Sequence, residues 1–281
     1  MRIPFTKMHG AGNDFIVFDA PRTAPLPTAG QFRALANRFT GIGFDQALVL
    51  HPPRRPGTTI YYQIFNSDGA EVEQCGNGAR CIAALLYRQG RAPAGEFVMD
   101  SCAGPVRARV ASQELVSVDM GVPSFEPAAL PFDAAERQER YALKAGNDTV
   151  EIGAVSIGNP HAVVQVPAVD SAPVERLGPA IEGHRRFPRR VNVGFMEVVD
   201  RSDIRLRVYE RGVGETLACG TGACAAVVVG RQQGLLDPQV RVRARGGELR
   251  VDWAGPGEPV WLTGPAEVAF EGHFEMRDAA T

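Results

Sequence analysis

The chain has 281 residues, of which 44% are hydrophobic and 22% are charged, and its formal net charge is −2. This is the composition of an ordinary globular protein. The near-zero charge argues against nucleic acid or an anionic membrane as a partner, but it excludes neither an enzyme nor a binding module. The N-terminal residues 1–15 contain no apolar core of signal-peptide length, and no apolar run approaches the roughly 20 residues that span a bilayer. We therefore expect a cytoplasmic protein without a nucleic-acid or membrane partner.

Short β-strands are predicted along most of the chain, because apolar and polar residues alternate between Gly, Pro and Asp. In chain order they cover residues 15–18, 47–50, 60–65, 96–99, 106–110, 115–120, 154–156, 162–166, 193–199, 204–209, 240–245, 249–253 and 260–263, with a last strand near 268–270. So many strands with few helices favour antiparallel sheets or barrels over a Rossmann pattern.

Two helices are predicted, over residues 77–89 and 221–233. Each is apolar almost all round, which is typical of a helix buried on every side, and each ends in Gln-Gly, a suitable C-terminal cap. We expect both helices to run through the middle of a sheet. Residues 121–144, with three prolines, are the candidate linker, and residues 51–57 are a candidate hairpin loop.

The sequence repeats itself once. Residues 75–79, Cys-Gly-Asn-Gly-Ala, return 144 positions later as residues 219–223, Cys-Gly-Thr-Gly-Ala. Other polar positions follow at nearly the same spacing: Asn13 with Asn159, Gln46 with Asn192, and Asn66 with Glu210. A period this long predicts two copies of one domain rather than a solenoid. The predicted domains are residues 1–120, completed by the C-terminal strand near 265–281, and residues 121–264.

The repeated cysteines, Cys75 and Cys219, each precede a predicted buried helix. The first turn of a helix offers free N–H groups and a positive dipole end, so it binds a carboxylate and lowers the pKa of a nearby thiol. Two such elements related by duplication predict a pocket between two facing domains, with one thiol on each side. The chain has five cysteines and no secretion signal, which indicates free thiols in a reducing compartment.

Paired thiols suit the inversion of an amino-acid Cα. The reaction removes a proton from one face and delivers one to the other, which two acid/base groups accomplish and a single base does not. Helix N-termini aimed at the substrate carboxylate would stabilise the developing carbanion. No lysine stands in a motif of the kind that pyridoxal phosphate requires, so we expect no cofactor and no metal.

The remaining repeated polar residues suit an amino-acid ligand. Asn13, Asn66, Asn159 and Asn192 offer amide donors and acceptors. Glu210 is a candidate partner for an ammonium group, Arg211 for a second carboxylate, and His161 for orienting a polar group.

These residues lie in stretches that resemble the diaminopimelate epimerase family over nearly the whole chain. The stretches are residues 7–15 (Lys-Met-His-Gly-Ala-Gly-Asn-Asp-Phe), 41–46 (Gly-Ile-Gly-Phe-Asp-Gln), 66–70 with 75–80, 158–161 (Gly-Asn-Pro-His), and 210–212 with 219–223. The resemblance implies an α+β fold of two pseudo-symmetric domains, each a mostly antiparallel, β-barrel-like sheet around a central buried helix. It also implies cofactor-independent interconversion of LL- and meso-2,6-diaminopimelate, in lysine and peptidoglycan biosynthesis.

The resemblance further assigns residues to the site. Cys75 and Cys219 match the family's catalytic thiols, and His161 and Glu210 match positions that tune catalysis. The substrate contacts fall on Asn13, Gln46, Asn66, Gly76, Asn77, Asn159, Asn192, Glu210, Arg211, Gly220 and Thr221. Family members are commonly homodimers, and the segment near Phe270 matches a dimer-forming region. Cys81 and Cys224 have no role in the pattern, and we expect them to be core residues.

Three alternatives remain open at this point. A proline or hydroxyproline racemase would also use paired cysteines, although its substrate lacks the second carboxylate that Arg211 suits. A structural zinc site is disfavoured, because Cys75 with Cys81 and Cys219 with Cys224 lack the usual C-x₂₋₄-C spacing. A reversible Cys75–Cys219 disulfide, acting as a redox switch, would be compatible with catalysis.

Overall fold

The computed structural model describes residues 2–20, 25–73, 75–112, 115–146 and 148–275. These residues form two compact units, one within Met1–Val118 and Gly264–Thr281 and the other within Asp119–Thr263. The boundaries predicted from the repeat were 120/121 and 264/265. Of the C-terminal segment predicted to complete the first domain, residues 276–281 lie outside the described part of the chain.

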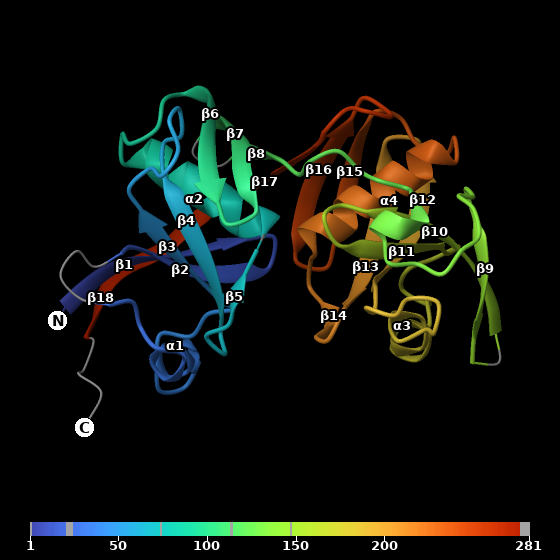
Figure 1. Ribbon diagram of the computed structural model, residues 1–281, viewed down its shortest axis with the longest axis horizontal. Coiled ribbons are helices and arrows are strands. Elements are labelled where there is room, and N and C mark those ends of the chain that lie inside the picture. The colour runs from blue at the N-terminus through green and yellow to red at the C-terminus, as the bar shows by residue number, and fades with distance from the viewer. Residues whose placement is uncertain (1, 21–24, 74, 113–114, 147, 276–281) are drawn as a thin grey trace. The chain divides into compact units, whose positions relative to one another are not determined.

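Unit 1 is built on one sheet (Figure 1). Its elements are β1 (Arg2–Gly10), β2 (Asn13–Asp19), α1 (Ala29–Ala36), β3 (Gln46–His51), β4 (Tyr61–Asn66), β5 (Glu71–Val72), α2 (Gly76–Arg88), β6 (Gly95–Ser101), β7 (Gly104–Ser112), β8 (Leu115–Asp119) and β18 (Glu267–Glu275). The strands pair in the order β18-β1-β2-β3-β4-β6-β7-β8, with β5 beside β4. The pairs β2–β3 and β4–β6 are parallel and the others are antiparallel.

Unit 2 repeats this plan. Its elements are the 3₁₀ helix η1 (Pro127–Ala129), β9 (Tyr141–Ala145), β10 (Asp148–Ser156), β11 (Pro160–Gln165), α3 (Val174–Glu182), β12 (Asn192–Asp200), β13 (Asp203–Glu210), β14 (Gly214–Thr216), α4 (Gly220–Gln232), β15 (Gln239–Ala244), β16 (Gly247–Trp253) and β17 (Val260–Gly264). The strands pair in the order β9-β10-β11-β12-β13-β15-β16-β17, with β14 beside β13.

The two units correspond strand by strand. The parallel pairs β11–β12 and β13–β15 stand where unit 1 has β2–β3 and β4–β6. The helices α2 and α4 both have 13 residues and occupy the same place in the order of elements. This arrangement confirms the predicted duplication and the predicted class of two pseudo-symmetric α+β domains.

Each central helix is buried because the sheet of its unit packs along it. All residues from Gly76 to Leu86 of α2 are buried, as are Gly220 and residues 222–230 of α4. The helix α2 packs against β1, β2, β3 and β7, and α4 packs against β10, β11, β12, β13 and β16. The prediction of two helices enclosed by sheet residues is therefore confirmed.

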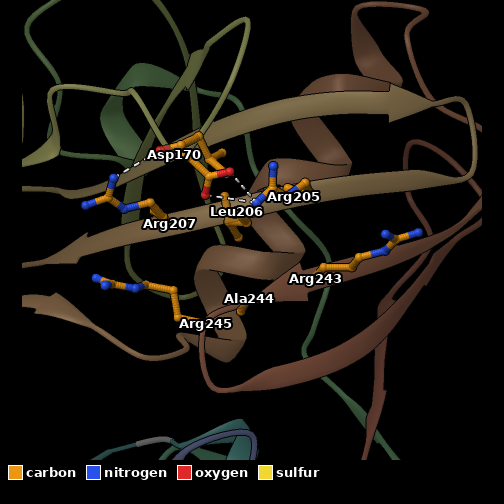
Figure 2. Close-up of a pocket in the computed structure, with 8 residues that line it drawn as sticks. Asp170, Arg205, Leu206, Arg207, Arg243, Ala244 and Arg245 are labelled. Atoms are coloured by element: carbon orange, nitrogen blue, oxygen red, sulfur yellow. Dashed lines mark hydrogen bonds and ion pairs between the residues drawn. The ribbon is translucent and has the colours of Figure 1, made fainter.

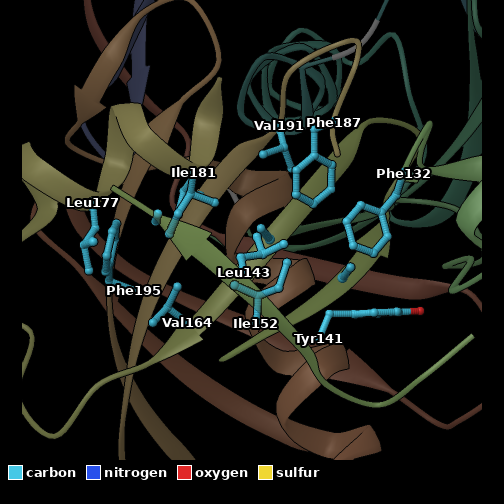
Figure 3. Close-up of a cluster of buried hydrophobic side chains, with 14 of the residues drawn as sticks. Phe132, Tyr141, Leu143, Ile152, Val164, Leu177, Ile181, Phe187, Val191 and Phe195 are labelled. Carbon is cyan, nitrogen blue, oxygen red and sulfur yellow. The ribbon is translucent and has the colours of Figure 1, made fainter. Parts of the chain in front are cut away.

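A second helix covers the other face of each sheet. In unit 1, Phe32 of α1 joins a core cluster with Ile16 and Phe18 of β2. In unit 2, Leu177 and Ile181 of α3 pack on strands β9 to β12 (Figure 3). Strands covered on both faces read as continuous apolar runs, and α1 and α3 supply the crossovers that parallel pairs require.

Both crossover helices were missed by sequence reasoning. The helix α1 carries a start signal, because Thr28 Oγ1 accepts from Gln31 N at 3.3 Å and Gln31 Oε1 accepts from Thr28 N at 2.8 Å. This capping box was visible in the sequence. By contrast, α3 contains Pro179, has Gly178 packed under the ring of Tyr209, and lacks a side-chain N-cap.

The prediction of a linker over residues 121–144 is wrong. Leu130, Phe132, Tyr141 and Leu143 are buried in the core of unit 2 (Figure 3), and the Arg186 guanidinium lies over the Phe132 ring at 4.4 Å. The segment therefore belongs to the second unit. Residues 51–57 do connect the antiparallel strands β3 and β4, as predicted. Within the described residues, no helix is both long and apolar enough to cross a membrane.

Candidate active site

The two repeated cysteines are the N-cap residues of the two central helices. Cys75 Sγ accepts a hydrogen bond from Gly78 N at 3.5 Å, and Cys219 Sγ accepts one from Gly222 N at 3.4 Å. Both cysteines have extended backbone conformations, which turn the thiol back over the first helical turn. The prediction that each thiol stands at the start of a buried helix is confirmed.

In unit 2, hydrogen bonds connect His161 to Cys219 through two neutral side chains. His161 Nε2 lies 2.9 Å from Asn159 Oδ1, Asn159 Nδ2 donates to Thr221 Oγ1 at 3.4 Å, and Thr221 Oγ1 lies 3.4 Å from Cys219 Sγ. The Thr221 hydroxyl, which accepts from Asn159, therefore lies within hydrogen-bond distance of the sulfur at the end of the series.

His161 is held in its neutral form. Burial, and then the charge of Arg211, lower the pKa of His161 to about 3. A neutral ring that donates from Nε2 to Asn159 carries a lone pair on Nδ1. That Nδ1 atom is buried, and no residue of the described ranges hydrogen-bonds to it.

Cys219 departs from the sequence-based expectation of a low pKa. Burial raises the pKa of the Cys219 thiol well above its ordinary value, and the charge of Glu210 raises it further, while hydrogen bonds from Thr221 and Gly222 lower it by less. Glu210 is held in place, because Thr216 Oγ1 donates to its Oε1 at 2.5 Å. Desolvation and a neighbouring carboxylate outweigh the helix N-terminus here, so Cys219 rests as a thiol.

Asn192 and Arg211 contact each other through the backbone. Asn192 Nδ2 donates to Pro160 O at 3.1 Å, and its Oδ1 accepts from Arg211 N at 3.0 Å. The Asn192 amide is buried and occupied by these backbone groups, so it holds the start of β11 and the end of β13 together. The Arg211 side chain is exposed, and among the described residues its guanidinium donates to Arg189 O at 3.2 Å.

Amide side chains also line the corresponding part of unit 1. Gln46 Nε2 donates to Asn66 Oδ1 at 2.9 Å across the β3–β4 pair. Asn77 Nδ2, in the first turn of α2, donates to Asn13 Oδ1 at 3.2 Å. Gln46 Oε1 is buried without a hydrogen-bond partner among the described residues. The predicted positions of this half thus form two hydrogen-bonded pairs, Gln46 with Asn66 and Asn13 with Asn77.

Two charged residues that sequence reasoning gave no role contact these amides. Asp45 Oδ2 accepts from Asn13 Nδ2 at 2.7 Å, and Arg80 Nη2 donates to Asn77 Oδ1 at 2.9 Å. Arg80 is 0% exposed, which is rare for arginine. The signal for Arg80 in the sequence was its charge, because it stands between the apolar residues Ala79 and Cys81 on a helix predicted to be buried.

A cluster of ions holds the loop that carries Asp45. Arg38 Nη2 lies 2.7 Å from Asp45 Oδ1 and 2.8 Å from Asp14 Oδ1, and Lys7 Nζ lies 2.6 Å from Asp14 Oδ2. Burial alone would raise the pKa of Asp14, but the hydrogen bonds from Arg38 and Lys7 lower it to about 2. This carboxylate therefore stays ionised and ties the loop to β1 and β2.

The other cysteines lie apart from these interactions. Cys81 and Cys224 are fully buried in α2 and α4, as expected of core residues, and Cys102 is exposed. None of the five cysteines forms a disulfide within the described residues. Across the described ranges, no three His, Cys, Asp or Glu side chains are grouped so as to hold a metal ion.

Unit 2 also carries a cavity of about 410 Å³ that contains none of the predicted site residues (Figure 2). It is lined by Val169, Asp170, Arg205, Leu206, Arg207, Arg243, Ala244 and Arg245. Its arginines are already paired with carboxylates: Arg205 with Asp170, Arg243 with Asp203, and Arg207 with Glu215. An anion would have to displace these partners, so we assign the cavity no part in the site.

Solved structures share this fold at low sequence identity. A probable proline racemase from Agrobacterium radiobacter matches with a TM-score of 0.68 and 18% identity, over 98% of this chain and 93% of that one. A PhzF-family phenazine biosynthesis protein from Bacillus anthracis matches with a TM-score of 0.68 and 17% identity, over 98% of this chain and 100% of that one. These likenesses support the fold alone.

Sequence comparison is more specific. The family model described as diaminopimelate epimerase matches residues 5–126 and 153–269. A diaminopimelate epimerase from Alkalilimnicola ehrlichii is 54% identical over 278 residues, covering 98% of this chain and 100% of the relative. One from Chromobacterium violaceum is 53% identical over 276 residues, again covering 98% and 100%. The chain therefore belongs to the diaminopimelate epimerase family.

Proposed function

We propose that the chain epimerises LL-2,6-diaminopimelate to the meso form, with Cys75 and Cys219 as its two acid/base groups. The observation that carries the proposal is that a cysteine caps the central helix in both copies of the duplicated unit, with its sulfur over the first turn. The relatives that share over half of their residues with this chain bear the name of that enzyme.

The proposed reaction moves one proton off the substrate and another on. In one direction, the Cys75 thiolate takes the Cα proton and becomes a thiol, while the Cys219 thiol gives its proton to the opposite face and becomes a thiolate. Cys219 suits the role of acid in this direction, because burial and Glu210 raise the pKa of its thiol. Thr221 and the Gly222 N–H would then stabilise the thiolate that forms.

The charge that develops in the reaction lies on the substrate, where the Cα carbanion spreads into the adjacent carboxylate. The free N–H groups at the starts of α2 and α4 suit that negative charge. Gly76 and Gly220, the first residues of the two helices, would therefore lie near the carboxylate. No cofactor is needed if these donors supply the stabilisation.

The remaining predicted residues receive two kinds of role in this proposal. Asn13, Gln46, Asn66, Asn77, Asn159, Glu210, Arg211 and Thr221 would contact substrate, with Arg211 on the distal carboxylate. Asn192 and His161 would be positioning residues. The Asn192 side chain is hydrogen-bonded to backbone groups, and His161 orients Asn159. The exposed Arg211 guanidinium keeps donors for a bidentate carboxylate.

The proposal extends to assembly and location. We propose a cytoplasmic homodimer that uses the segment near Phe270. In its support, Phe270 is 49% exposed on β18, a strand whose one pairing among the described strands of unit 1 is with β1. Sedimentation equilibrium of the wild type and of Phe270→Asp would test this, since a monomer at micromolar concentration in both would contradict it.

The substrate is tested by incubating reduced protein with LL-diaminopimelate and separating the stereoisomers, with L-proline and trans-4-hydroxy-L-proline in parallel. We expect LL-to-meso conversion without added cofactor and none with either proline. Conversion of a proline and not of diaminopimelate would favour the racemase alternative, because the fold alone does not separate the two.

A further inference from the structure

Four hydrogen-bonded side chains cross unit 1 from its surface to its core. Asn13 donates to Asp45 at 2.7 Å, Asn77 donates to Asn13 at 3.2 Å, and Arg80 donates to Asn77 at 2.9 Å. The Asp45 side chain is 40% exposed, whereas the Arg80 side chain is fully buried. The series therefore has an anion at its outer end and a cation at its inner end.

The two charged ends permit one orientation of each amide. A carboxylate accepts hydrogen bonds and a guanidinium donates them, whereas an amide does both. Asn77 must turn its carbonyl toward Arg80, which leaves its NH₂ for Asn13, and Asn13 must turn its NH₂ toward Asp45. If either amide flipped, two donors or two acceptors would face each other in a partly buried site.

We propose that Asp45 and Arg80 are positioning residues, which fix the Asn13 and Asn77 amides so that both present an N–H to a substrate carboxylate. The proposal rests on the function given above. Each amide uses one N–H within the series, and no other hydrogen bond among the described residues uses the second N–H. A flipped amide would present a carbonyl oxygen to the carboxylate and repel it.

The second unit is built differently at the same place. The positions that correspond to the two charged ends hold Val191 and Cys224, both buried. There Asn159, in the turn between β10 and β11, donates to the helix residue Thr221, which is the opposite direction to unit 1. The two half-sites are therefore not interchangeable, and the charged pair is a feature of the Cys75 half.

The test compares Arg80→Met, Arg80→Lys and Asp45→Ala with Cys81→Ala, a buried neighbour on α2 that has no place in the series. We expect Arg80→Met and Asp45→Ala to lower kcat/KM for LL-diaminopimelate by about 10- to 100-fold, mainly through KM, because each removes a hydrogen bond to a charged group. Arg80→Lys keeps a donor and should recover part of the loss. Misfolding alone would lower the active fraction, and so kcat, without raising KM.

A double variant separates positioning from packing. If Arg80 acts through Asn77, Arg80→Met should lower kcat/KM less than 3-fold further in an Asn77→Ala background, by the logic of a double-mutant cycle. A full additional loss would overturn the proposal, as would wild-type KM values for both Arg80→Met and Asp45→Ala. If Arg80→Met does not fold, the KM of Asp45→Ala, at the half-exposed end of the series, tests the proposal. An inactive wild type would instead contradict the proposed function.

Discussion

The glycine three residues after each proposed catalytic cysteine offers a test of how the sulfur is positioned. A Cβ on Gly222 would lie 3.2 Å from Cys219 Cβ, 3.4 Å from its Sγ and 3.1 Å from Val208 Cγ2. The contacts with Cys219 Cβ and Val208 Cγ2 are shorter than ordinary van der Waals contacts between carbon atoms, so these side chains, and with them the Cys219 thiol, must shift by a few tenths of an ångström. The backbone of Gly222 is helical, and alanine is favoured over glycine in a helix by about 1 kcal/mol.

Gly222→Ala should therefore separate stability from activity. We expect the midpoint of thermal unfolding to change by only a few degrees, since helix propensity offsets the crowding. We expect kcat/KM to fall about 10-fold, because small displacements of a reacting atom are costly. The assay is LL-to-meso conversion by chiral separation, beside thermal unfolding followed by circular dichroism.

Gly78→Ala is the matched control, at the equivalent position of α2. Its Cβ would meet Leu48 Cδ2 at 3.0 Å and Phe15 Cε1 at 3.5 Å, and the sulfur of Cys75 is not among its nearest atoms. We expect it to cost about 1–3 kcal/mol of stability through overpacking, with a smaller loss of kcat/KM. Wild-type kcat/KM in Gly222→Ala, or a larger loss in Gly78→Ala, would refute the reasoning.

Three further predictions follow from the site and the core. Glu210→Gln removes the charge that raises the pKa of the Cys219 thiol, so iodoacetamide should alkylate Cys219 faster at pH 8, as measured by mass spectrometry; an equal or slower rate would contradict this. The pKa of buried His161 is lowered to about 3 in the folded protein, so folding disfavours protonation of this ring. The effect of His161 on the free energy of unfolding is therefore most favourable above pH 6.5, where the ring is neutral in the unfolded chain as well, and this advantage is lost as the pH falls. From pH 7 to pH 5 the wild type should lose about 2 kcal/mol more than His161→Gln in urea unfolding, and equal losses would show that His161 is charged or exposed. Phe187→Ala should cost about 3–5 kcal/mol in the same assay, because the ring is 2% exposed and stacks on Phe132 at 4.4 Å, and a cost below 1 kcal/mol would contradict the packing.

The sequence predicted the features that local pattern determines. The Cys-Gly-x-Gly repeat identified both N-caps, and the apolar runs that follow identified α2 and α4 as buried helices. Ordered polar positions around the repeat identified the duplication. These features could be predicted because each depends on residues close together in the chain.

Features that depend on tertiary packing were missed. A strand buried on both faces reads as an apolar run, and such a run does not show which element covers the second face. For this reason α1 and α3 were not predicted. The pKa of Cys219 was predicted in the wrong direction, because burial and the neighbouring Glu210 come from the folded unit and not from the helix start. Asp45 and Arg80 lie 35 positions apart in the sequence and meet only through Asn13 and Asn77.

The central claim is that two thiols serve opposite faces of one Cα, and isotope transfer from D₂O tests it most directly. We would start separately from LL- and meso-diaminopimelate and follow deuterium in substrate and product by NMR and chiral separation, with Cys75→Ala and Cys219→Ala in parallel. We predict that deuterium enters the product first in both directions and that neither variant epimerises. Epimerisation that persists in either variant, or products that keep the substrate's own proton, would contradict it.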